Sequence, residues 1–348
     1  MSYFRDNIDK TAGYMPGFQP VSTEVIKLNT NENPYPTSPK VLEAIRNVTA
    51  DQLRRYPNPM GQEFREAAAK VNGVEPENII CTNGGDDLLT IAIRAFCDKN
   101  RPLAYPVPTY TLYSVLTELQ DCPMIEVPFK KDFALPDELK DTNASLTIVC
   151  NPNAPSGTYL PPLVLADFAA KIKGALFVDE AYIDFAPQSC ASMVRELDNI
   201  IILRTMSKGY SLAGLRFGYG IASTNIIETL MKVKDSYNVD AIAIKAATAA
   251  ILDQEYFKIN VEKIKAERTR LTTILHRLGF EVYDSHSNFL LAKCPGGNGQ
   301  KFFDELVKRN IFVRYWSSPD LADKLRITVG TPQQNDRLIE ALKEIKNK

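Results

Sequence analysis

The residue best suited to covalent chemistry in this sequence of 348 residues is Lys208. It follows a short apolar run that ends at Leu203, with Ser207 and Arg216 close to it along the chain. A lysine at the end of a strand can be desolvated and held near cations, which lowers its pKa and makes the amine a nucleophile toward aldehydes. Ser207 and Arg216 would then hold an anion beside it, most simply a phosphate. The alternative is an ordinary solvated lysine in a loop.

A carboxylate follows another apolar run. Asp179 comes directly after Ala175–Val178, so we expect its side chain in the crevice at the edge of an α/β sheet. A buried carboxylate needs a partner, and a protonated pyridine nitrogen, a Mg²⁺ ion or a helix N-terminus would each serve. The absence of a G-x-x-x-x-G-K-[ST] motif weakens the nucleotide–metal alternative. Tyr182, a little further on, would place its hydroxyl near the same ligand.

Two glycines follow a third apolar run, Ile79–Thr82. The chain continues with Asn83, Gly84, Gly85 and Asp86, and a helix is expected to begin at once. Glycines let backbone N–H groups approach an anion, and a helix N-terminus favours negative charge. A plain strand-to-helix turn capped by Asp86 is the alternative. Because the motif is not G-x-G-x-x-G, a dinucleotide is poorly supported.

Two more strand ends carry side chains suited to a flat ring. Tyr110 stands at a predicted strand-to-helix junction, where its ring would lie against a ligand or pack in the core. Asn153 lies in the loop VCNPNAPSG, where its amide would bond a ligand hydroxyl or form an Asx-turn. A phosphate cradle, a stacking aromatic, a carboxylate for a pyridinium and a reactive lysine are together the groups needed to hold pyridoxal 5′-phosphate.

The elements that must position these residues alternate along the chain. Short apolar runs alternate with helical periods such as Asp86–Phe96, Tyr110–Leu119 and Pro162–Lys171, which favours a mostly parallel α/β sheet covered on both faces. The runs are Ile79–Thr82, Leu103–Tyr105, Met124–Val127, Leu146–Cys150, Ala175–Val178, Ile200–Leu203 and Phe217–Ile221.

The chain changes character after a long helical region predicted for Thr224–Leu278. Strand patterns at 280–283, 288–293, 311–316 and 325–330 surround a helix at Gln300–Lys308, and a final helix is predicted for Pro332–Lys346. This pattern indicates a smaller α+β domain. The Pro- and Asn-rich N-terminal arm has no core of its own and must pack on another part of the protein.

The composition excludes several classes of protein. Apolar residues make up 45% and charged residues 24%, as in globular proteins, and the net charge of −1 gives no reason to expect nucleic acid or an anionic membrane as partner. Six cysteines without a C-x-x-C pair and only 2 histidines argue against a metal site. The N-terminus has no apolar signal sequence, and the most apolar stretch, Ala241–Leu252, is too short to span a bilayer. We therefore predict a cytoplasmic protein.

The sequence resembles the fold-type I, pyridoxal-phosphate-dependent aminotransferases, and among them the histidinol-phosphate aminotransferase branch. The resemblance extends from KLNTNENPYPTSPKV (27–41) through RRYPNP, TNGGDDLL, VPTYTLY, NPNAPSG, VDEAYIDF and RTMSKGYSLAGLRFG to SNFLLAK and LRITVGT. It implies an arm (1–35) that packs with the small domain and a partner subunit, a large cofactor domain (36–255) with a mostly parallel seven-stranded sheet, and a small α+β domain (256–348).

The resemblance also implies a role for each site residue. Lys208 would condense with the cofactor aldehyde and then carry a proton between the substrate Cα and cofactor C4′, while Asp179 would pair with the ring nitrogen and Tyr182 would bond the 3′-oxygen. Arg326 would bind the substrate carboxylate, Arg314 and Tyr14 the substrate phosphate, and Asn33 the substrate. The implied cofactor-binding residues are Gly84, Gly85, Asp86, Tyr110, Asn153, Asp179, Tyr182, Ser207, Lys208, Arg216 and, from the neighbouring subunit of a homodimer, Tyr56.

The activity implied by the resemblance is transamination of L-histidinol phosphate with 2-oxoglutarate in histidine biosynthesis. An aromatic amino acid aminotransferase and a decarboxylase of a phosphorylated amino acid, such as threonine phosphate, are the alternatives. One position departs from the family pattern N-P-N-N-P-T-G: Ala154 stands where the family has the asparagine that bonds the 3′-oxygen. Either Asn153 takes over that bond, or Tyr182 supports the oxygen with less help.

Overall fold

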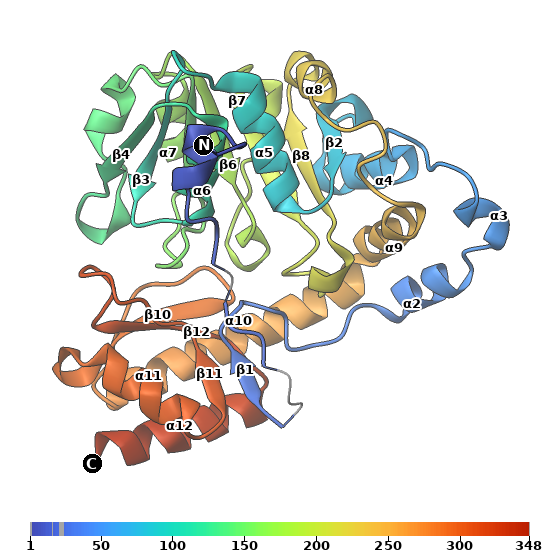
Figure 1. Ribbon diagram of the computed structural model, residues 1–348. Helices are drawn as coiled ribbons and strands as arrows, with labels where there is room; N and C mark the ends of the chain where they lie inside the picture. Colours follow the sequence, from blue (N-terminus) through green and yellow to red (C-terminus); the bar gives the residue numbers. More distant parts are fainter. Residues whose placement is uncertain (1, 16, 21–23, 348) are drawn as a thin grey trace.

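A seven-stranded sheet forms the centre of the larger part of the molecule (Figure 1). The structure is a computed structural model that describes residues 2–15, 17–20 and 24–347. All neighbouring strands of this sheet are parallel except β8, which is antiparallel to both β2 and β7. The prediction of a mostly parallel α/β sheet is confirmed. The strand order is β2 (Ile79–Thr82), β8 (Gly218–Ala222), β7 (Ile200–Thr205), β6 (Ala175–Asp179), β5 (Leu146–Cys150), β3 (Leu103–Val107) and β4 (Met124–Pro128).

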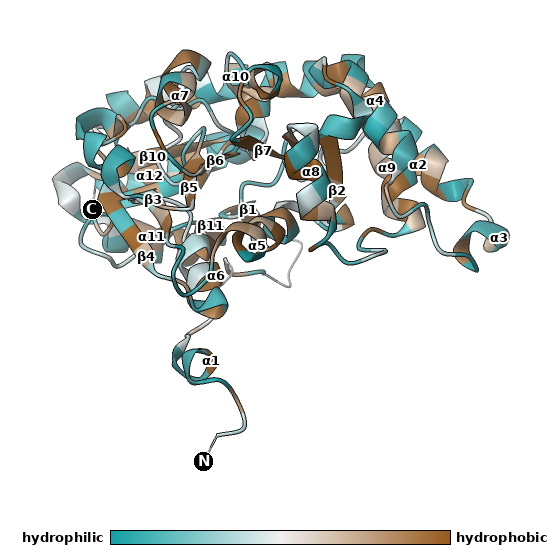
Figure 2. Cartoon of the chain, turned by 90° about the horizontal axis from the view of Figure 1, so that it is seen from above, coloured by the Kyte–Doolittle hydropathy of each residue, from teal (hydrophilic) through white to brown (hydrophobic). Residues whose placement is uncertain are grey.

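Helices cover both faces of this sheet, so its central strands are buried throughout. Strands β5 and β6 have no exposed position, and successive residues join different core clusters: Val149 and Val178 pack into one, Ile148 and Phe177 into the other. Because side chains alternate along a strand, the two clusters lie on opposite faces. In Figure 2 the strands β2 and β7 are correspondingly hydrophobic. The surrounding helices are α2 (Pro39–Arg46), α4 (Gln62–Asn72), α5 (Gly85–Phe96), α6 (Leu112–Gln120), α7 (Pro162–Ala169), α8 (Thr224–Met231) and α9 (Ala241–Leu252). Helix α3 (Ala50–Leu53) projects from the side of the molecule (Figure 1).

A smaller α+β unit packs below the large sheet in the view of Figure 1. Strand β10 (Phe289–Lys293) lies between β9 (Glu281–Val282) and β12 (Lys324–Thr328), antiparallel to both. The helices α10 (Gln254–Arg277), α11 (Gly299–Val307) and α12 (Pro332–Lys346) enclose a third core cluster with these strands. The predicted α+β character of this region agrees with the structure.

Two predicted elements differ from the structure. The helical region Thr224–Leu278 is three helices, α8, α9 and α10, because the chain leaves helical geometry between Met231 and Ala241 and again at Asp253. The strand expected at 311–316 is shorter: β11 ends at Val313, and the next residue makes only an isolated bridge to β12.

The N-terminal arm packs on both parts of the molecule. Strand β1 (Ile26–Leu28) pairs in parallel with β11 (Ile311–Val313), so the arm supplies a strand to the smaller unit. Helix α1 (Asp6–Lys10) lies against α6, where Arg5 and Asn7 donate hydrogen bonds to the last carbonyls of that helix. The domain boundaries at residues 35 and 255 stay predictions.

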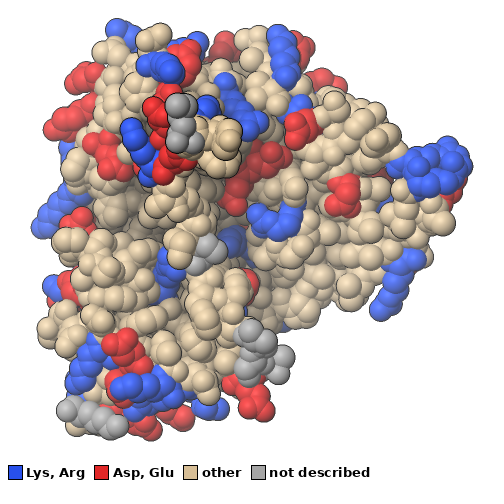
Figure 3. Space-filling view, in the orientation of Figure 1, with Lys and Arg blue, Asp and Glu red and all other residues tan. Residues whose placement is uncertain are grey.

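The surface carries both signs of charge side by side. In Figure 3 the acidic and basic side chains are interspersed over the visible face. Arg54 and Arg55, which follow α3, are both paired with Asp51. Among the described residues, the helices are all too short or too polar to cross a bilayer.

Candidate active site

A cavity of about 610 Å³ lies at the carboxyl edge of the large sheet, between that sheet, the arm and the smaller unit. This is the edge at which α/β sheets bind ligands. Residues at or just after the ends of β3, β5, β6 and β7 form one wall. The predicted site residues that line the cavity are Tyr14, Gly85, Asp86, Tyr110, Asp179, Tyr182, Ser207, Lys208, Arg216, Arg314 and Arg326.

Lys208 projects into this cavity from the turn after β7. Its ammonium nitrogen lies 3.3 Å from the Thr30 carbonyl oxygen and 5.6 Å from the centre of the Tyr182 ring. Burial, followed by the nearby Arg326, lowers the pKa of Lys208 to about 8. A neutral, nucleophilic amine is therefore accessible near neutral pH.

Asp179 ends β6 and faces the same cavity. The Tyr113 hydroxyl donates to Oδ2 at 2.6 Å and the Ala181 N–H donates to Oδ1 at 3.1 Å. Burial raises the pKa of Asp179 to about 6, and these two hydrogen bonds oppose that rise. Since both donors are neutral, the carboxylate keeps its negative charge and can pair with a cationic group in the cavity.

Aromatic rings form another wall of the cavity. Tyr110 makes edge-to-face contacts with Tyr14 at 5.8 Å and with Tyr113 at 5.6 Å between ring centres. Burial raises the pKa of the Tyr110 hydroxyl, which therefore stays protonated. Tyr113 is a site residue that the sequence pattern did not indicate, although it follows Tyr110 by only three residues.

An anion-binding corner lies where α5 begins. Gly84 has a positive φ of 83°, a backbone conformation that favours glycine, and a Cβ there would lie 2.8 Å from Arg216 Nη2. Arg216 lies 3.5 Å from Asp86 Oδ2, and both side chains are about half exposed. The helix N-terminus, the guanidinium and the Ser207 hydroxyl together can hold a phosphate.

Two arginines of the smaller unit complete the cavity. Arg314 and Arg326 face each other across an isolated β-bridge, and each lies 5.2 Å from the centre of the Trp316 ring. Arg326 donates to the Asn29 carbonyl oxygen at 3.1 Å, but its Nε is buried without a partner. No ion pair joins either arginine to a carboxylate of the described chain. Both guanidiniums are therefore available to anionic groups of a ligand.

Known proteins resemble this chain along its whole length. The family model for aminotransferase class I and II matches residues 23–342. The histidinol-phosphate aminotransferase 1 of Trichormus variabilis is 49% identical over 99% of both chains, and the histidinol-phosphate aminotransferase of Citrifermentans bemidjiense is 42% identical over the same shares. The chain belongs to the class I and II aminotransferase family.

Solved structures agree with this assignment. The histidinol-phosphate aminotransferase of Sinorhizobium meliloti, solved with pyridoxal-5′-phosphate, has a TM-score of 0.90 and 26% identity and covers 100% of this chain and 98% of its own. An L-threonine-O-3-phosphate decarboxylase of Porphyromonas gingivalis has a TM-score of 0.81 at 23% identity, covering 93% of this chain and 100% of its own. That second likeness shows the fold alone.

The cavity of this aminotransferase fits pyridoxal 5′-phosphate, the cofactor of its family. It combines an amine of lowered pKa, a buried carboxylate suited to a pyridinium and a helix N-terminus with Arg216 suited to a phosphate. The Nε of Arg326, which has no partner among the described residues, adds a donor available to a ligand.

Four predicted site residues of the aminotransferase do not line the cavity: Gly84, Asn33, Asn153 and Tyr56. Asn33 instead donates to the backbone carbonyl of Lys208 at 3.1 Å, which holds the turn that carries the lysine. Tyr56 is 79% exposed and stacks on Tyr237 at 4.4 Å, away from this chain's own cavity.

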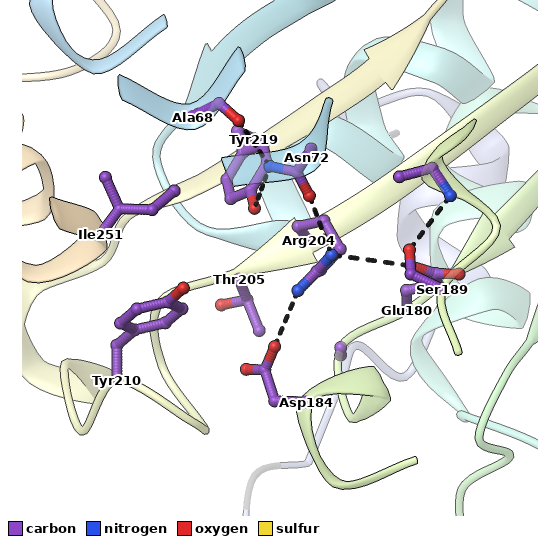
Figure 4. A network of polar contacts seen from close by, with 12 residues as sticks. Ala68, Asn72, Glu180, Asp184, Ser189, Arg204, Thr205, Tyr210, Tyr219 and Ile251 are labelled. Carbon is purple, nitrogen blue, oxygen red and sulfur yellow. Dashed lines mark hydrogen bonds and ion pairs between the residues drawn. The ribbon is translucent and has the colours of Figure 1, made fainter. Parts of the chain in front are cut away.

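A buried charge network lies behind the turn that carries Lys208 (Figure 4). Arg204 donates to Asp184 Oδ1 at 2.7 Å and to Asn72 Oδ1 at 3.2 Å, and lies 3.9 Å from Glu180 Oε2. Burial raises the pKa of both carboxyls, and Arg204 opposes that rise. A Cβ at Gly209 would collide with Asp184, so the network packs directly on the backbone next to Lys208.

The alternation of side chains along the strands places this network on the side away from the cavity. Asp179, Leu203 and Thr205 face the cavity, whereas Glu180 and Arg204, their immediate neighbours, join the network. Successive side chains of an extended chain point to opposite sides. The same two strand ends therefore supply the cavity on one side and its buried support on the other.

Replacing Arg204 by methionine (Arg204→Met) should lower the free energy of unfolding by about 3–5 kcal/mol, because Asp184 and Glu180 lose their buried cation. The unpaired carboxyls would have folded pKa values above their unfolded ones, so the loss should grow as pH rises above about 5. Urea unfolding measures both effects. Arg54→Met, at the exposed pair with Asp51, is the matched control and should change little; equal losses in the two variants would contradict the role of the network.

Condensation of the cofactor-free protein with pyridoxal 5′-phosphate should speed up as pH rises through about 8, rather than through the ordinary lysine value of 10.5. Only the deprotonated amine attacks the aldehyde, so the rate follows the neutral fraction of Lys208. Stopped-flow absorbance would record the yellow product. Lys208→Arg should give none, and a rate that rises only near 10.5 would refute a desolvated lysine.

Proposed function

We propose that this protein transaminates L-histidinol phosphate with 2-oxoglutarate, giving imidazole acetol-phosphate and L-glutamate in histidine biosynthesis. The observation that carries the proposal is a single cavity that holds an amine of lowered pKa and two arginines without carboxylate partners among the described residues. One arginine suffices for an ordinary amino acid carboxylate. The second provides for a further anionic group, as a phosphorylated substrate has. The relatives named histidinol-phosphate aminotransferase support this choice.

In this proposal, different residues of the cavity bind different parts of the cofactor. When bound, pyridoxal 5′-phosphate supplies an aldehyde and an electron-accepting ring. Lys208 would hold the aldehyde, Asp179 the ring nitrogen, Tyr110 the ring face and Tyr182 the ring oxygen. The start of α5, with Gly85 and Asp86, would hold the phosphate together with Ser207 and Arg216.

Two residues of this chain would set the protonation needed for reaction. Asp179, with a pKa of about 6, is ionised at neutral pH and keeps a proton on the ring nitrogen. The Nζ of Lys208, with a pKa of about 8, would take up the proton from the substrate Cα and deliver it to cofactor C4′. The pKa of Lys208 lies close to neutral pH, where a general base works most efficiently.

The arginines would orient the substrates. Arg326 would bind the carboxylate of glutamate or 2-oxoglutarate, and Arg314 with Tyr14 would bind the phosphate of histidinol phosphate. Because one lysine site must accept the amino donor and the amino acceptor in turn, a ping-pong cycle is expected.

We also propose that the protein acts as a homodimer in the cytoplasm. The segment around α3 projects from the side of the molecule in Figure 1 and exposes Leu53 at 58% and Tyr56 at 79%. Exposed apolar side chains on a projecting segment favour its use as an interface. Tyr56 would reach the phosphate corner of the partner's cavity. The free state of all six cysteines supports the cytoplasmic location.

Incubation of the holoenzyme with L-glutamate alone should release 2-oxoglutarate and convert the cofactor to its amine form. Adding L-histidinol phosphate in place of glutamate should give a keto product, and L-threonine phosphate, which has a carboxylate that histidinol phosphate lacks, should release no carbon dioxide. Arg314→Leu should lower kcat/KM about 100-fold for the phosphate substrate, the value of one charge-assisted contact, and spare phenylalanine. Carbon dioxide release would favour the decarboxylase. Equal losses of kcat/KM for the phosphate substrate and for phenylalanine would contradict the role of Arg314.

Mixing inactive Lys208→Ala and Tyr56→Ala subunits should restore about a quarter of the wild-type activity. About half of the dimers in a random mixture are hybrids, and each hybrid has one intact site if the two residues come from different subunits. The assay is glutamate-dependent keto-acid production after co-refolding. A mixture as inactive as its parents would show that Tyr56 acts within its own chain or not at all.

A further inference from the structure

Asn31 in the arm has no role in the reaction proposed above, yet all four of its polar groups are bonded. Its N–H donates to Thr328 Oγ1 at 3.0 Å, and its carbonyl accepts from Asn288 Nδ2 at 2.9 Å. Its side-chain Oδ1 accepts from Thr328 Oγ1 at 3.1 Å, and its Nδ2 donates to the Tyr182 hydroxyl at 2.9 Å. The residue is 1% exposed and has a φ of 56°. This side chain is fixed from every side.

The Asn31 amide lies with its oxygen toward Thr328 and its nitrogen toward Tyr182. The Thr328 oxygen accepts the backbone N–H of Asn31, so its own proton is free to be donated to the amide oxygen Oδ1. The amide nitrogen is therefore the atom that faces Tyr182. An amide nitrogen donates but does not accept, so the Tyr182 oxygen must be the acceptor in this contact.

The hydroxyl proton of Tyr182 is consequently left for another partner. Within the described chain, the bond from Asn31 is the only hydrogen bond made by this hydroxyl, and both residues line the cavity. The Phe289 ring meets the Tyr182 ring edge-on at 5.0 Å between centres, which holds the ring in place. An oxygen of a ligand in the cavity is the partner that remains.

The neighbouring loop does not supply an alternative donor. Asn153 uses its amide nitrogen on Ser156 and on the Pro108 carbonyl, and its amide oxygen accepts from Thr109 at 2.9 Å. It does not line the cavity, whereas Ala154, which does, has no polar side chain. Of the two possibilities left open by the sequence, the structure favours support by Tyr182, with Asn31 as its helper.

We propose that Asn31 is a positioning residue that makes Tyr182 a dedicated hydrogen-bond donor to an anionic ring oxygen of the ligand. The proposal rests on the proposed function, since that oxygen is the phenolic oxygen of the hydroxypyridine cofactor. Donation from Asn31 also polarises the phenol: burial raises the pKa of Tyr182 to about 12, and Arg326 and the Asn31 amide both oppose the rise. The hydroxyl thus stays protonated, but its proton is a stronger donor.

The substitution Asn31→Asp tests this direction of donation. Aspartate has nearly the same shape and tolerates a positive φ, but its carboxylate would accept the Tyr182 proton and withdraw it from the cavity. In the holoenzyme without substrate, the pKa of the bound cofactor's absorbance change should rise by about one unit, because its anionic oxygen loses a donor. The dissociation constant of the cofactor should increase about 10-fold.

Two further variants separate this role from other causes. Tyr182→Phe should give a spectral shift of similar size, and adding Asn31→Asp to it should change nothing more. Asn31→Gly, which keeps the positive φ but removes the amide, should shift the spectrum in the same direction without adding charge. An unchanged spectrum in Asn31→Asp, or a shift that persists in the Tyr182→Phe background, would overturn the proposal.

Failure of this inference can be told from failure of the proposed function. The spectra need only bound cofactor, whereas the proposed function needs the half-reaction with glutamate in the wild-type protein. A wild type that transaminates while Asn31→Asp leaves the spectrum unchanged refutes the Asn31 role alone. A wild type that binds the cofactor but does not react with any amino donor refutes the transaminase alone.

Discussion

The whole site depends on holding one ammonium group, that of Lys208, away from water and close to other cations. Burial lowers the pKa of this lysine, and Arg326 and Arg216 add to the effect. An isolated buried lysine would simply destabilise the fold. Here the opposing charges of Asp86 and Glu32, and the rigid turn after β7, keep the amine in place while leaving it able to lose its proton.

The rigidity of that turn comes from the opposite face of the same strands. Arg204 and Glu180 lie one residue from positions that face the cavity, and with Asp184 they form a closed set of buried charges. Asn33 adds two hydrogen bonds to the carbonyls of Lys208 and Gly209. A buried ion pair is weak evidence for stability in itself, but it fixes geometry wherever breaking it leaves an unpaired charge.

The sequence predicted best what a short segment determines by itself. Asp179 and Lys208 follow apolar runs, and a strand end in a parallel sheet places a side chain at the ligand edge. It predicted poorly what depends on distant partners. The bonds from Asn31 to Thr328 join residues 297 positions apart, so no local pattern announces them. Asn153 was assigned to the ligand from its loop motif, but its amide is used by Ser156, Thr109 and the Pro108 carbonyl.

The pairing of β1 with β11 has a mechanical consequence. The chain passes from α1, which lies against α6 of the larger part, to β1 of the smaller unit, crosses back before α2, and returns to the smaller unit along α10. Three covalent crossings therefore join the two parts instead of one. The second crossing, residues 29–38, carries Thr30, Asn31 and Glu32, which line the cavity. Any shift of one part against the other would therefore move residues of the cavity wall directly.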